Sequence, residues 1–308
     1  MSNFIVTTSI NNVTKAIKLY DNMKNWKLIV VGDLKTPKNY KLKNGIYLSP
    51  NDQIKIDKKL SKLIPWNCIQ RRNFGFILAK KLGAKIVASI DDDNIPKKNW
   101  GKNLYLKKRT IANKFSTKQM VFDPISPTNH NDLWHRGFPL QLIRGKNKII
   151  KKRGTITPHV QADFWDEDPD VDAVQRLITN TKTKFSKKPF PFFSNKISPF
   201  NSQNTFISVE ALKDYFMFPY IGRMDDIWGA YYLLSKGYKV IFGKASVIQK
   251  RNIHDYTKDF EKEVLGYIKN LELVKDIKKN SENISKYLPK KSYQAFKQYQ
   301  KNFWYEEN

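Results

Sequence analysis

Short apolar runs alternate along the first third of the chain with segments that have helical spacing. Residues 4–8 and 27–31 are apolar and β-branched, which predicts two buried strands. Residues 13–22, between them, carry apolar side chains three and four positions apart, which predicts a helix. Strand, helix and strand at this pitch predict a parallel sheet of the βαβ type.

The most informative run is residues 86–90, a predicted buried strand that is followed directly by Asp91, Asp92 and Asp93. Three adjacent carboxylates repel one another unless a cation lies among them. The carboxyl end of a strand in an α/β sheet is also where ligands bind. We therefore expect a divalent metal held against a phosphate-bearing ligand, with a solvated acidic loop as the alternative.

Basic and amide side chains precede this strand. Residues 74–82 have an apolar helical face that ends at Gly83, and Arg71, Arg72 and Asn73 fall in the first turn. Cations there oppose the helix dipole, so an anion at that end explains them better than helix stability does. Exposed surface arginines are the alternative.

Two later segments also have the composition of a site. Residues 133–140 place Arg136 in an irregular, aromatic stretch, which suits a sugar or phosphate pocket or else a structural turn. Asp225 and Asp226 begin a predicted helix, where they act as first-turn acids or where one is a general base or a sugar-hydroxyl acceptor.

Weaker candidates complete the set. Asp33 follows the second strand beside Gly32 and is interpreted equally well as a ribose or base acceptor and as a turn residue. The amide-rich segment 198–207, which includes Gln203 and Asn204, is expected to line a sugar or acceptor site. His254 could complete a metal site, although a lone histidine is usually a surface residue.

The rest of the pattern predicts an α/β domain over residues 1–256 and a basic, helical extension over 257–308. Residues 160–169 are expected to form a strand that runs into an acidic turn. A helix over 172–177, a short helix over 209–216 and a strand over 238–242 are also expected. Residues 35–63 and 145–154 are expected to be irregular, and residues 100–115 a connecting helix or loop.

Charge narrows the expected partners. The chain has 308 residues, a net charge of +28 and 40% hydrophobic residues, which excludes a disordered chain and indicates an anionic partner. The lysines are spread along the whole chain and no nucleic-acid-binding motif is present, so nucleic acid is not expected, while peripheral contact with an anionic membrane surface stays open. A single cysteine, Cys68, and the lack of a signal peptide or apolar span predict a cytoplasmic protein.

Several blocks, in order, resemble one family. Arg-Arg-Asn-Phe-Gly-Phe at 71–76, Gly-Ala-Lys-Ile-Val at 83–87 and Asp-Asp-Asp-Asn at 91–94 resemble the core of the STELLO-type glycosyltransferase-like domain. Trp-His-Arg-Gly-Phe-Pro-Leu at 134–140, Ser-Gln-Asn-Thr at 202–205 and Arg-Met-Asp-Asp-Ile-Trp at 223–228 look like its later blocks. Their order is also similar to that of the reversibly glycosylated polypeptides, the UDP-arabinopyranose mutases, and the resemblance spans about residues 4–256.

The resemblance implies a GT-A-like fold, a mixed sheet flanked by helices, and a nucleotide-sugar site with Mn²⁺ or Mg²⁺. It implies that Asp91 and Asp93 hold the metal, with His254 as a further candidate ligand, and that Asp92 contacts the ribose or the metal. Candidate substrate-binding residues are Arg71, Arg72, Asn73, Arg136, Gln203, Asn204 and Asp33.

The expected function is metal-dependent transfer of a glycosyl group from a nucleotide-diphosphate sugar, expected to be UDP-linked, to an unknown glycan or small-molecule acceptor. The alternative is a UDP-sugar pyranose/furanose mutase. The mutases use an arginine shortly after their Arg-Gly-Tyr-Pro block, and the corresponding position here is Ile143, with Arg144 one residue later. Arg144 is therefore the candidate nucleophile of the mutase reading.

Overall fold

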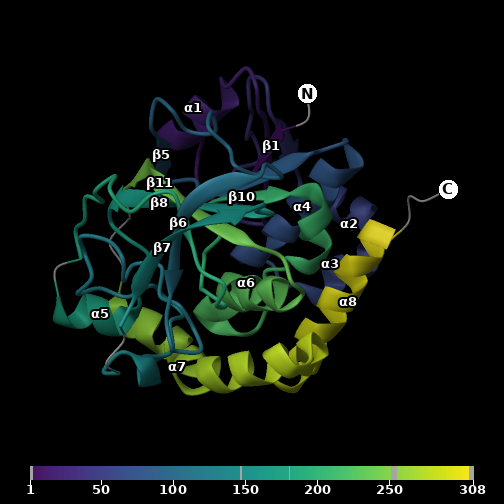
Figure 1. Cartoon of the computed structure of the whole chain (residues 1–308). Helices are drawn as coiled ribbons and strands as arrows, with labels where there is room; N and C mark the ends of the chain where they lie inside the picture. Colours follow the sequence, from purple (N-terminus) through teal and green to yellow (C-terminus); the bar gives the residue numbers. More distant parts are fainter. Residues whose placement is uncertain (1–2, 146–147, 180, 251–254, 305–308) are drawn as a thin grey trace.

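Eleven strands of one mixed sheet run through the residues that this computed structural model describes, which are 3–145, 148–179, 181–250 and 255–304 (Figure 1). The strand order is β3-β2-β1-β4-β10-β8-β11-β9-β6-β7, and β5 pairs with β11 outside this path. Helices flank the sheet and helices close the chain. The predicted fold class, an α/β mixed sheet with a helical C-terminal segment, is confirmed.

The first part of the chain forms a parallel sheet, as its apolar runs predicted. Strand β1 (Asn3–Thr8) lies between β2 (Lys27–Val31) and β4 (Ile86–Ile90), parallel to both. The short β3 (Ile46–Leu48) extends the sheet beside β2. Residues that follow these strands therefore emerge at one edge of the sheet.

The later strands bring more of the chain to the same edge. Strand β10 (Asn204–Ser208) is antiparallel to both β4 and β8 (Val160–Glu167), and β11 (Val240–Gln249) is parallel to β8. Strands β1, β4, β8 and β11 consequently point the same way. Their carboxyl ends meet the beginning of β10, because Asn204 pairs with Ile90.

The remaining strands extend the sheet beyond β11 or pair at its side. They are β5 (Asn94–Pro96), β6 (Thr110–Ser116), β7 (Ile150–Ile156) and β9 (Phe192–Phe193). Strands β6 and β7 pair over their full lengths, from Thr110 opposite Ile156 to Ser116 opposite Ile150. The expectation of irregular structure over 100–115 and 145–154 was therefore wrong in part, because β7 is an exposed edge strand whose lysines hide the usual alternation.

The segment 35–63, also expected to be irregular, contains β3 and two helices. The helices before β4 are α1 (Lys15–Asp21), α2 (Pro50–Ile56), α3 (Lys58–Leu63), the 3₁₀ helix η1 (Ile69–Arg71) and α4 (Arg72–Lys81). Ser49 and Asp52 form a capping box at α2, and Asp57 caps α3. These polar caps, in a segment with little apolar periodicity, explain why the helices escaped the hydrophobic pattern.

The remaining helices belong to the second half of the chain. They are η2 (Leu140–Leu142), α5 (Ala173–Ile178), η3 (Val209–Asp214), η4 (Gly222–Met224), α6 (Asp225–Ser235), α7 (Tyr256–Lys279), η5 (Ser281–Lys286) and α8 (Lys290–Trp304). Asp172 caps α5, at the start of the helix predicted over 172–177. The short helix expected over 209–216 is the 3₁₀ helix η3.

The C-terminal helices pack on the body of the molecule. Helix α7 runs beneath α6, and α8 lies beside α3 (Figure 1). Leu273 of α7 and Phe296 of α8 are buried in the same core cluster as Val6 and Val87 of the sheet. Within the described residues, no helix is both long and apolar enough to cross a membrane.

Gly75 sets how closely α4 approaches the sheet. A Cβ atom added at this position would lie 2.3 Å from Cγ1 of Val6 and 2.8 Å from Cγ2 of Val31, closer than real contacts allow. We expect Gly75→Ala to lower the free energy of unfolding by about 1–3 kcal/mol through overpacking. Lys81→Ala, at the exposed end of the same helix, is the control. Equal denaturant midpoints for the two variants would contradict this account of the packing.

Candidate active site

A cavity of about 510 Å³ lies at the edge where the strand ends meet. Thr8 is the last residue of β1, the acids Asp91–Asp93 follow β4, and Gln249 is the last residue of β11. The other lining residues are Cys68, Ile69, Gln70, Arg72, Arg136, Asp170, Ser202, Gln203, Gly222, Arg223, Asp225, Asp226 and Lys262. The topology of the sheet thus gathers segments that are far apart in the sequence.

Arg72 and Asp91 form an ion pair on one wall of this cavity. The Nη2 atom of Arg72 lies 2.8 Å from Oδ1 of Asp91. The Arg72 side chain is buried and also donates to the Ser89 hydroxyl and to the Ser202 carbonyl, at 3.1 and 2.9 Å. The chain itself thus supplies one positive charge beside the acids, and Asp91 stays partly exposed to the cavity.

Asp92 faces a different direction from Asp91. Its Oδ2 accepts from the hydroxyl of Ser9 at 2.5 Å and from the amide of Asn11 at 3.3 Å, and its carbonyl accepts from Thr14. Burial raises the pKa of Asp92, while the hydrogen bonds from Ser9 and Asn11 lower it. Asp92 thus fixes the loop that follows β1.

Asp92 also borders a second, smaller cavity of about 150 Å³. Asp33 lines this small cavity, together with Thr8, Asn11, Asn67 and Cys68. The carboxylate of Asp33 accepts from the backbone N–H groups of Leu34 and Cys68. Four residues, Thr8, Cys68, Ile69 and Asp92, line both cavities, so a ligand can extend from one into the other.

Asp91 and Asp93 are the carboxylates that fit a metal. Both line the large cavity, two positions apart on the turn after β4. Carboxylate oxygens suit Mg²⁺ and Mn²⁺, which are often bound by one or two carboxylates together with substrate phosphates. No group of three or more ligand-type side chains converges for a metal among the described residues. This donor set fits a metal that takes its remaining ligands from a bound anion.

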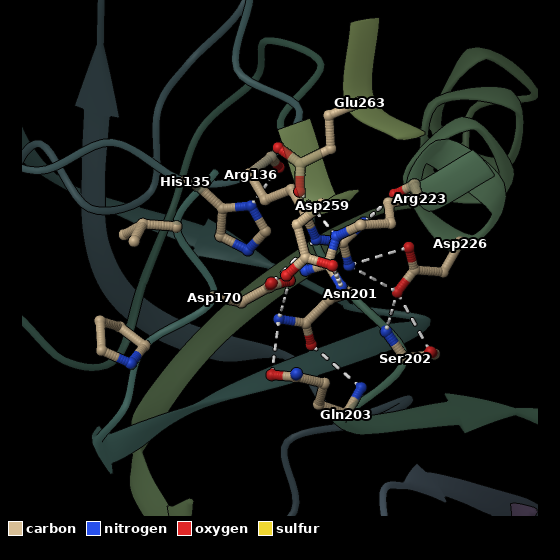
Figure 2. A network of polar contacts seen from close by, with 12 residues as sticks. His135, Arg136, Asp170, Asn201, Ser202, Gln203, Arg223, Asp226, Asp259 and Glu263 are labelled. Atoms are coloured by element: carbon tan, nitrogen blue, oxygen red, sulfur yellow. Dashed lines mark hydrogen bonds and ion pairs between the residues drawn. The ribbon is translucent and has the colours of Figure 1, made fainter. Parts of the chain in front are cut away.

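Arg136 forms the centre of the opposite wall. Figure 2 shows its guanidinium between the carboxylates of Asp170 and Asp226, at 2.8 Å from Asp170 and 3.0 Å from Asp226. Arg136 also donates to the carbonyl of Arg223. Burial opposes its charge, but the two carboxylates outweigh that effect and raise the pKa of Arg136. This cluster therefore stays charged and paired.

Asp226 and Asp225 differ in their surroundings although they are adjacent. Asp226 accepts from Arg136 twice and from the backbone N–H and hydroxyl of Ser202. The side chain of Asp225 accepts from Gln70 at 2.6 Å. No side chain caps α6, whose N-cap position is Met224. Asp226 is thus a structural anchor, and Asp225 is the acid that remains available for proton transfer.

The environment of Asp225 suits a base. Burial and the neighbouring Asp226 together raise its pKa to about 7, against the lowering influence of Arg136 and Gln70. A carboxyl group with a pKa near the working pH is the most effective proton acceptor at that pH.

The first turn of α7 closes one side of the cavity. Arg223 pairs with Glu263 at 2.7 Å and with Asp259 at 3.4 Å, as Figure 2 shows. Lys262 lines the cavity between these two acids in the sequence. A Cβ at Gly222, where φ is +63°, would lie 2.1 Å from the carbonyl oxygen of Lys262, so the glycine permits this close approach.

Several predicted site residues lie elsewhere. Arg71 is buried, and its guanidinium donates to Ser61 and to the carbonyls of Ile64 and Pro65. Asn73 bridges to the backbone of Met217. Both side chains are buried and form hydrogen bonds within the fold, so this turn is not open to an anion.

Two further candidates also stand outside the large cavity. Asn204 is buried and donates to Phe164 and Ser246, so its amide joins strands and does not line the cavity. Arg144 is exposed and is absent from the cavity lining. His254 lies outside the described residues. Arg72, Arg136, Gln203, Asp225, Asp226 and the three consecutive acids do lie together.

Sequence reasoning missed Asp170, Gln70 and Lys262. Asp170 was considered only as a helix cap, and Gln70 only as part of a helix start. Their partners, Arg136 and Asp225, are 34 and 155 residues away, so no local pattern could reveal them. The acidic turn after a buried strand was the one usable signal for Asp170.

Two proteins of Arabidopsis thaliana are similar in sequence. They are "Probable glycosyltransferase STELLO2", 24% identical over 208 residues, and "Probable glycosyltransferase STELLO1", 23% identical over 221 residues. These matches cover 64% and 66% of this chain but only 27% and 29% of the two relatives, so the chain spans less than a third of their length. The resemblance to the STELLO-type domain is thereby confirmed. No protein-family model matches the chain.

Solved structures of glucosyl-3-phosphoglycerate synthase from Mycobacterium tuberculosis share part of the shape. The complex with phosphoglyceric acid has a TM-score of 0.46 at 11% identity and covers 89% of this chain and 79% of that chain. The complex with Mn²⁺, uridine-diphosphate-glucose and phosphoglyceric acid has a TM-score of 0.45 at 12% identity, with the same coverage.

The contrast between Asp225 and Asp226 gives a paired prediction. Asp226→Asn weakens a buried ion pair, and we expect it to lower the free energy of unfolding by about 1–3 kcal/mol. The carboxyl of Asp225 has a folded pKa raised from 3.8 to about 7, so its contribution to stability falls as the pH rises through that window. Asp225→Asn, which cannot ionise, should therefore be at least as stable as the parent at pH 8. Thermal melts of both variants at pH 5 and pH 8 test this, and a larger loss for Asp225→Asn at pH 8 would contradict it.

Proposed function

We propose that the chain transfers a glycosyl group from a nucleotide-diphosphate sugar, in the UDP-linked class, to a hydroxyl of an acceptor. The observation that carries the proposal is the large cavity itself. It has a pair of metal-type carboxylates on one wall, a base-type carboxylate on another and a smaller cavity beside it. The similarity to two probable glycosyltransferases supports the same reaction class.

The two adjoining cavities support a position for the donor. The nucleoside enters the smaller one, where Asp33 and Asn67 offer polar atoms beside the apolar Ile10 and Val31. Asp92, which lines both cavities, lies at the level of the ribose. The diphosphate then extends past Asp91 and Asp93, and the sugar extends toward Asp225.

Asp91 and Asp93 would hold a divalent metal, whose positive charge would offset the charge that develops on the leaving group. Arg72 limits the repulsion among the acids while the cavity is empty of cations, because it already pairs with Asp91. The buried Arg72 and Arg136 do not reach outward for the phosphates, since their donors are directed to partners in the fold. Lys262, which is exposed, supplies positive charge to the cavity, whereas Arg223 is paired with Glu263 and Asp259.

Asp225 takes the proton of the acceptor hydroxyl. The acceptor oxygen forms a bond to the anomeric carbon, the bond from that carbon to the phosphate oxygen breaks, and the nucleotide diphosphate leaves with the electron pair. Gln70 holds the Asp225 carboxylate in place through its 2.6 Å hydrogen bond. Asp226 is committed to Arg136 and Ser202 through four hydrogen bonds, which leaves Asp225 as the acid for this step.

The mutase alternative requires a nucleophile close to the anomeric carbon. Arg144, its candidate, is exposed and lies outside the large cavity, and Arg136 is committed to two carboxylates. A basic nucleic-acid-binding protein is the non-enzymatic alternative, which the net charge of +28 would suit. The acidic lining of the large cavity favours transfer over both.

The metal assignment predicts coupled binding. We expect UDP to raise the melting temperature only when Mn²⁺ or Mg²⁺ is present, because the described residues supply too few ligands to hold the metal without the diphosphate. Asp91→Asn and Asp93→Asn should abolish this coupled shift without loss of fold. Asp52→Asn, at an exposed helix start, is the control. A metal-dependent UDP shift that persists in both cavity variants would refute the assignment.

The transferase and the mutase differ in covalent chemistry. We expect no pentose or hexose adduct on the protein after incubation with labelled UDP-sugar. The described arginines that line the large cavity, Arg72, Arg136 and Arg223, are all paired with carboxylates. Intact-mass spectrometry measures this directly. An adduct that appears on the parent and disappears in Arg144→Ala would favour the mutase.

A further inference from the structure

A further polar cavity, separate from the two described above, lies on the other side of the segment that carries Arg136. Its volume is about 380 Å³, within the range of about 300–1,000 Å³ that is typical of small-molecule sites. Trp134 and Phe138 line it, whereas Arg136, between them in sequence, lines the large cavity. We call this site the Trp134 cavity. The function proposed above makes no use of it.

One buried acceptor in the Trp134 cavity, on Gln119, lacks a donor within the described chain, and the carboxylate of Asp123 lies in the same lining. Asp123 is only 5% exposed, and its Oδ1 accepts from the backbone N–H groups of Ile125 and His135, each at 3.1 Å. The side-chain oxygen of Gln119 is buried and has no hydrogen-bond partner, while its nitrogen donates to the Leu142 carbonyl at 2.8 Å. An unsatisfied buried acceptor is costly, so a ligand that brings donors gains from Gln119, and the Asp123 carboxylate offers a further acceptor.

The charge of the lining separates the classes of ligand. Among the described residues that line the Trp134 cavity there is no lysine or arginine, although 56 of the 308 residues in the chain are Lys or Arg. The lining contains two acids, Asp123 and Asp132, so a phosphate or carboxylate ligand has no counter-charge there. A cationic ligand is disfavoured by the +28 charge of the whole protein. A neutral ligand rich in hydroxyl donors fits both constraints.

Aromatic side chains complete the set. Trp134 is half-buried, and its indole N–H donates to Asp172 at 2.6 Å, which fixes the orientation of the ring. Asn131 and Ser126 add polar groups toward the opening. An oriented aromatic ring beside carboxylate and amide acceptors suits a pyranose or furanose, which has an apolar face and a rim of hydroxyl groups.

We propose that the Trp134 cavity binds a neutral sugar unit, with Asp123 and Gln119 accepting hydrogen bonds from its hydroxyl groups and Trp134 packing against its apolar face. The proposal is independent of the transferase function, because it concerns a different cavity and requires no reaction. Burial raises the pKa of Asp123 to about 7. The fraction of its ionised form, the stronger acceptor, therefore increases as the pH rises through that value.

Ligand-observed saturation-transfer NMR tests the proposal with glucose, galactose, arabinose and cellobiose at millimolar concentration, in the presence of excess UDP and Mn²⁺. Inorganic phosphate and putrescine are the anionic and cationic comparisons. We expect at least one neutral sugar to bind, and Asp123→Asn and Gln119→Met each to weaken it about 10-fold or more. Asp91→Asn, a matched change in the large cavity, should leave this binding unchanged.

Three outcomes would overturn the proposal. They are the absence of binding by any neutral sugar, preferential binding of phosphate or putrescine at this site, and sugar binding that Asp91→Asn abolishes but Asp123→Asn does not. Should Asp123→Asn fail to give the parent's far-UV circular dichroism, Gln119→Met decides, because it keeps the side-chain length and removes only the amide. Failure of the transferase proposal would instead appear as lost UDP coupling with sugar binding intact.

Discussion

The guanidinium of Arg136, buried between Asp170 and Asp226, is the interaction on which the site depends. It joins three segments that are far apart in the sequence. They are the irregular stretch before η2, the turn after β8 and the start of α6. A buried charge is tolerated only when it is paired and hydrogen-bonded, so removing one partner leaves the other exposed to a large desolvation cost. Because Asp226 is held by this pairing, α6 begins with Asp225 directed to Gln70 and the cavity.

The sheet topology decides which residues can share this cavity. Strands β1, β4, β8 and β11 end at one edge, and the antiparallel β10 begins there, so each connection adds a side chain to the same space. The order of the strands also separates the acids. Asp91 meets Arg72, whereas Asp92, one residue later, turns to Ser9 and the loop after β1. One acid is thus kept for the cavity and its neighbour is used to fix a loop.

The sequence was sufficient for the elements whose apolar pattern is strong. Strands β2 and β4 begin and end where the pattern predicted, and the acids after β4 lie in a cavity as expected. The fates of Arg71 and Arg72 could not be predicted. Consecutive residues of a helix point about 100° apart, so one of them faces Ser61 while the other faces Asp91.

The resemblance to the blocks of the STELLO-type domain located Arg136, Asp225 and Asp226. It did not separate the role of Asp225 from that of Asp226. That separation came from Gln70, Asp170 and Ser202, which are joined to the motifs only by long-range contacts. Lys262 belongs to a helix that was expected to be a separate extension, and its place in the cavity depends on the approach allowed by Gly222. Such contacts leave no periodic trace in a single sequence.

The central claim is that the acids after β4 and the acid at the start of α6 act on one nucleotide sugar. The most direct test is anomalous diffraction from crystals soaked with Mn²⁺ and UDP. The account predicts an anomalous peak within bonding distance of the carboxylates of Asp91 and Asp93, with the diphosphate as its further ligand and the uridine beside Asp33. A metal peak elsewhere with UDP bound, or UDP bound in this cavity without contact to either carboxylate, would contradict the account.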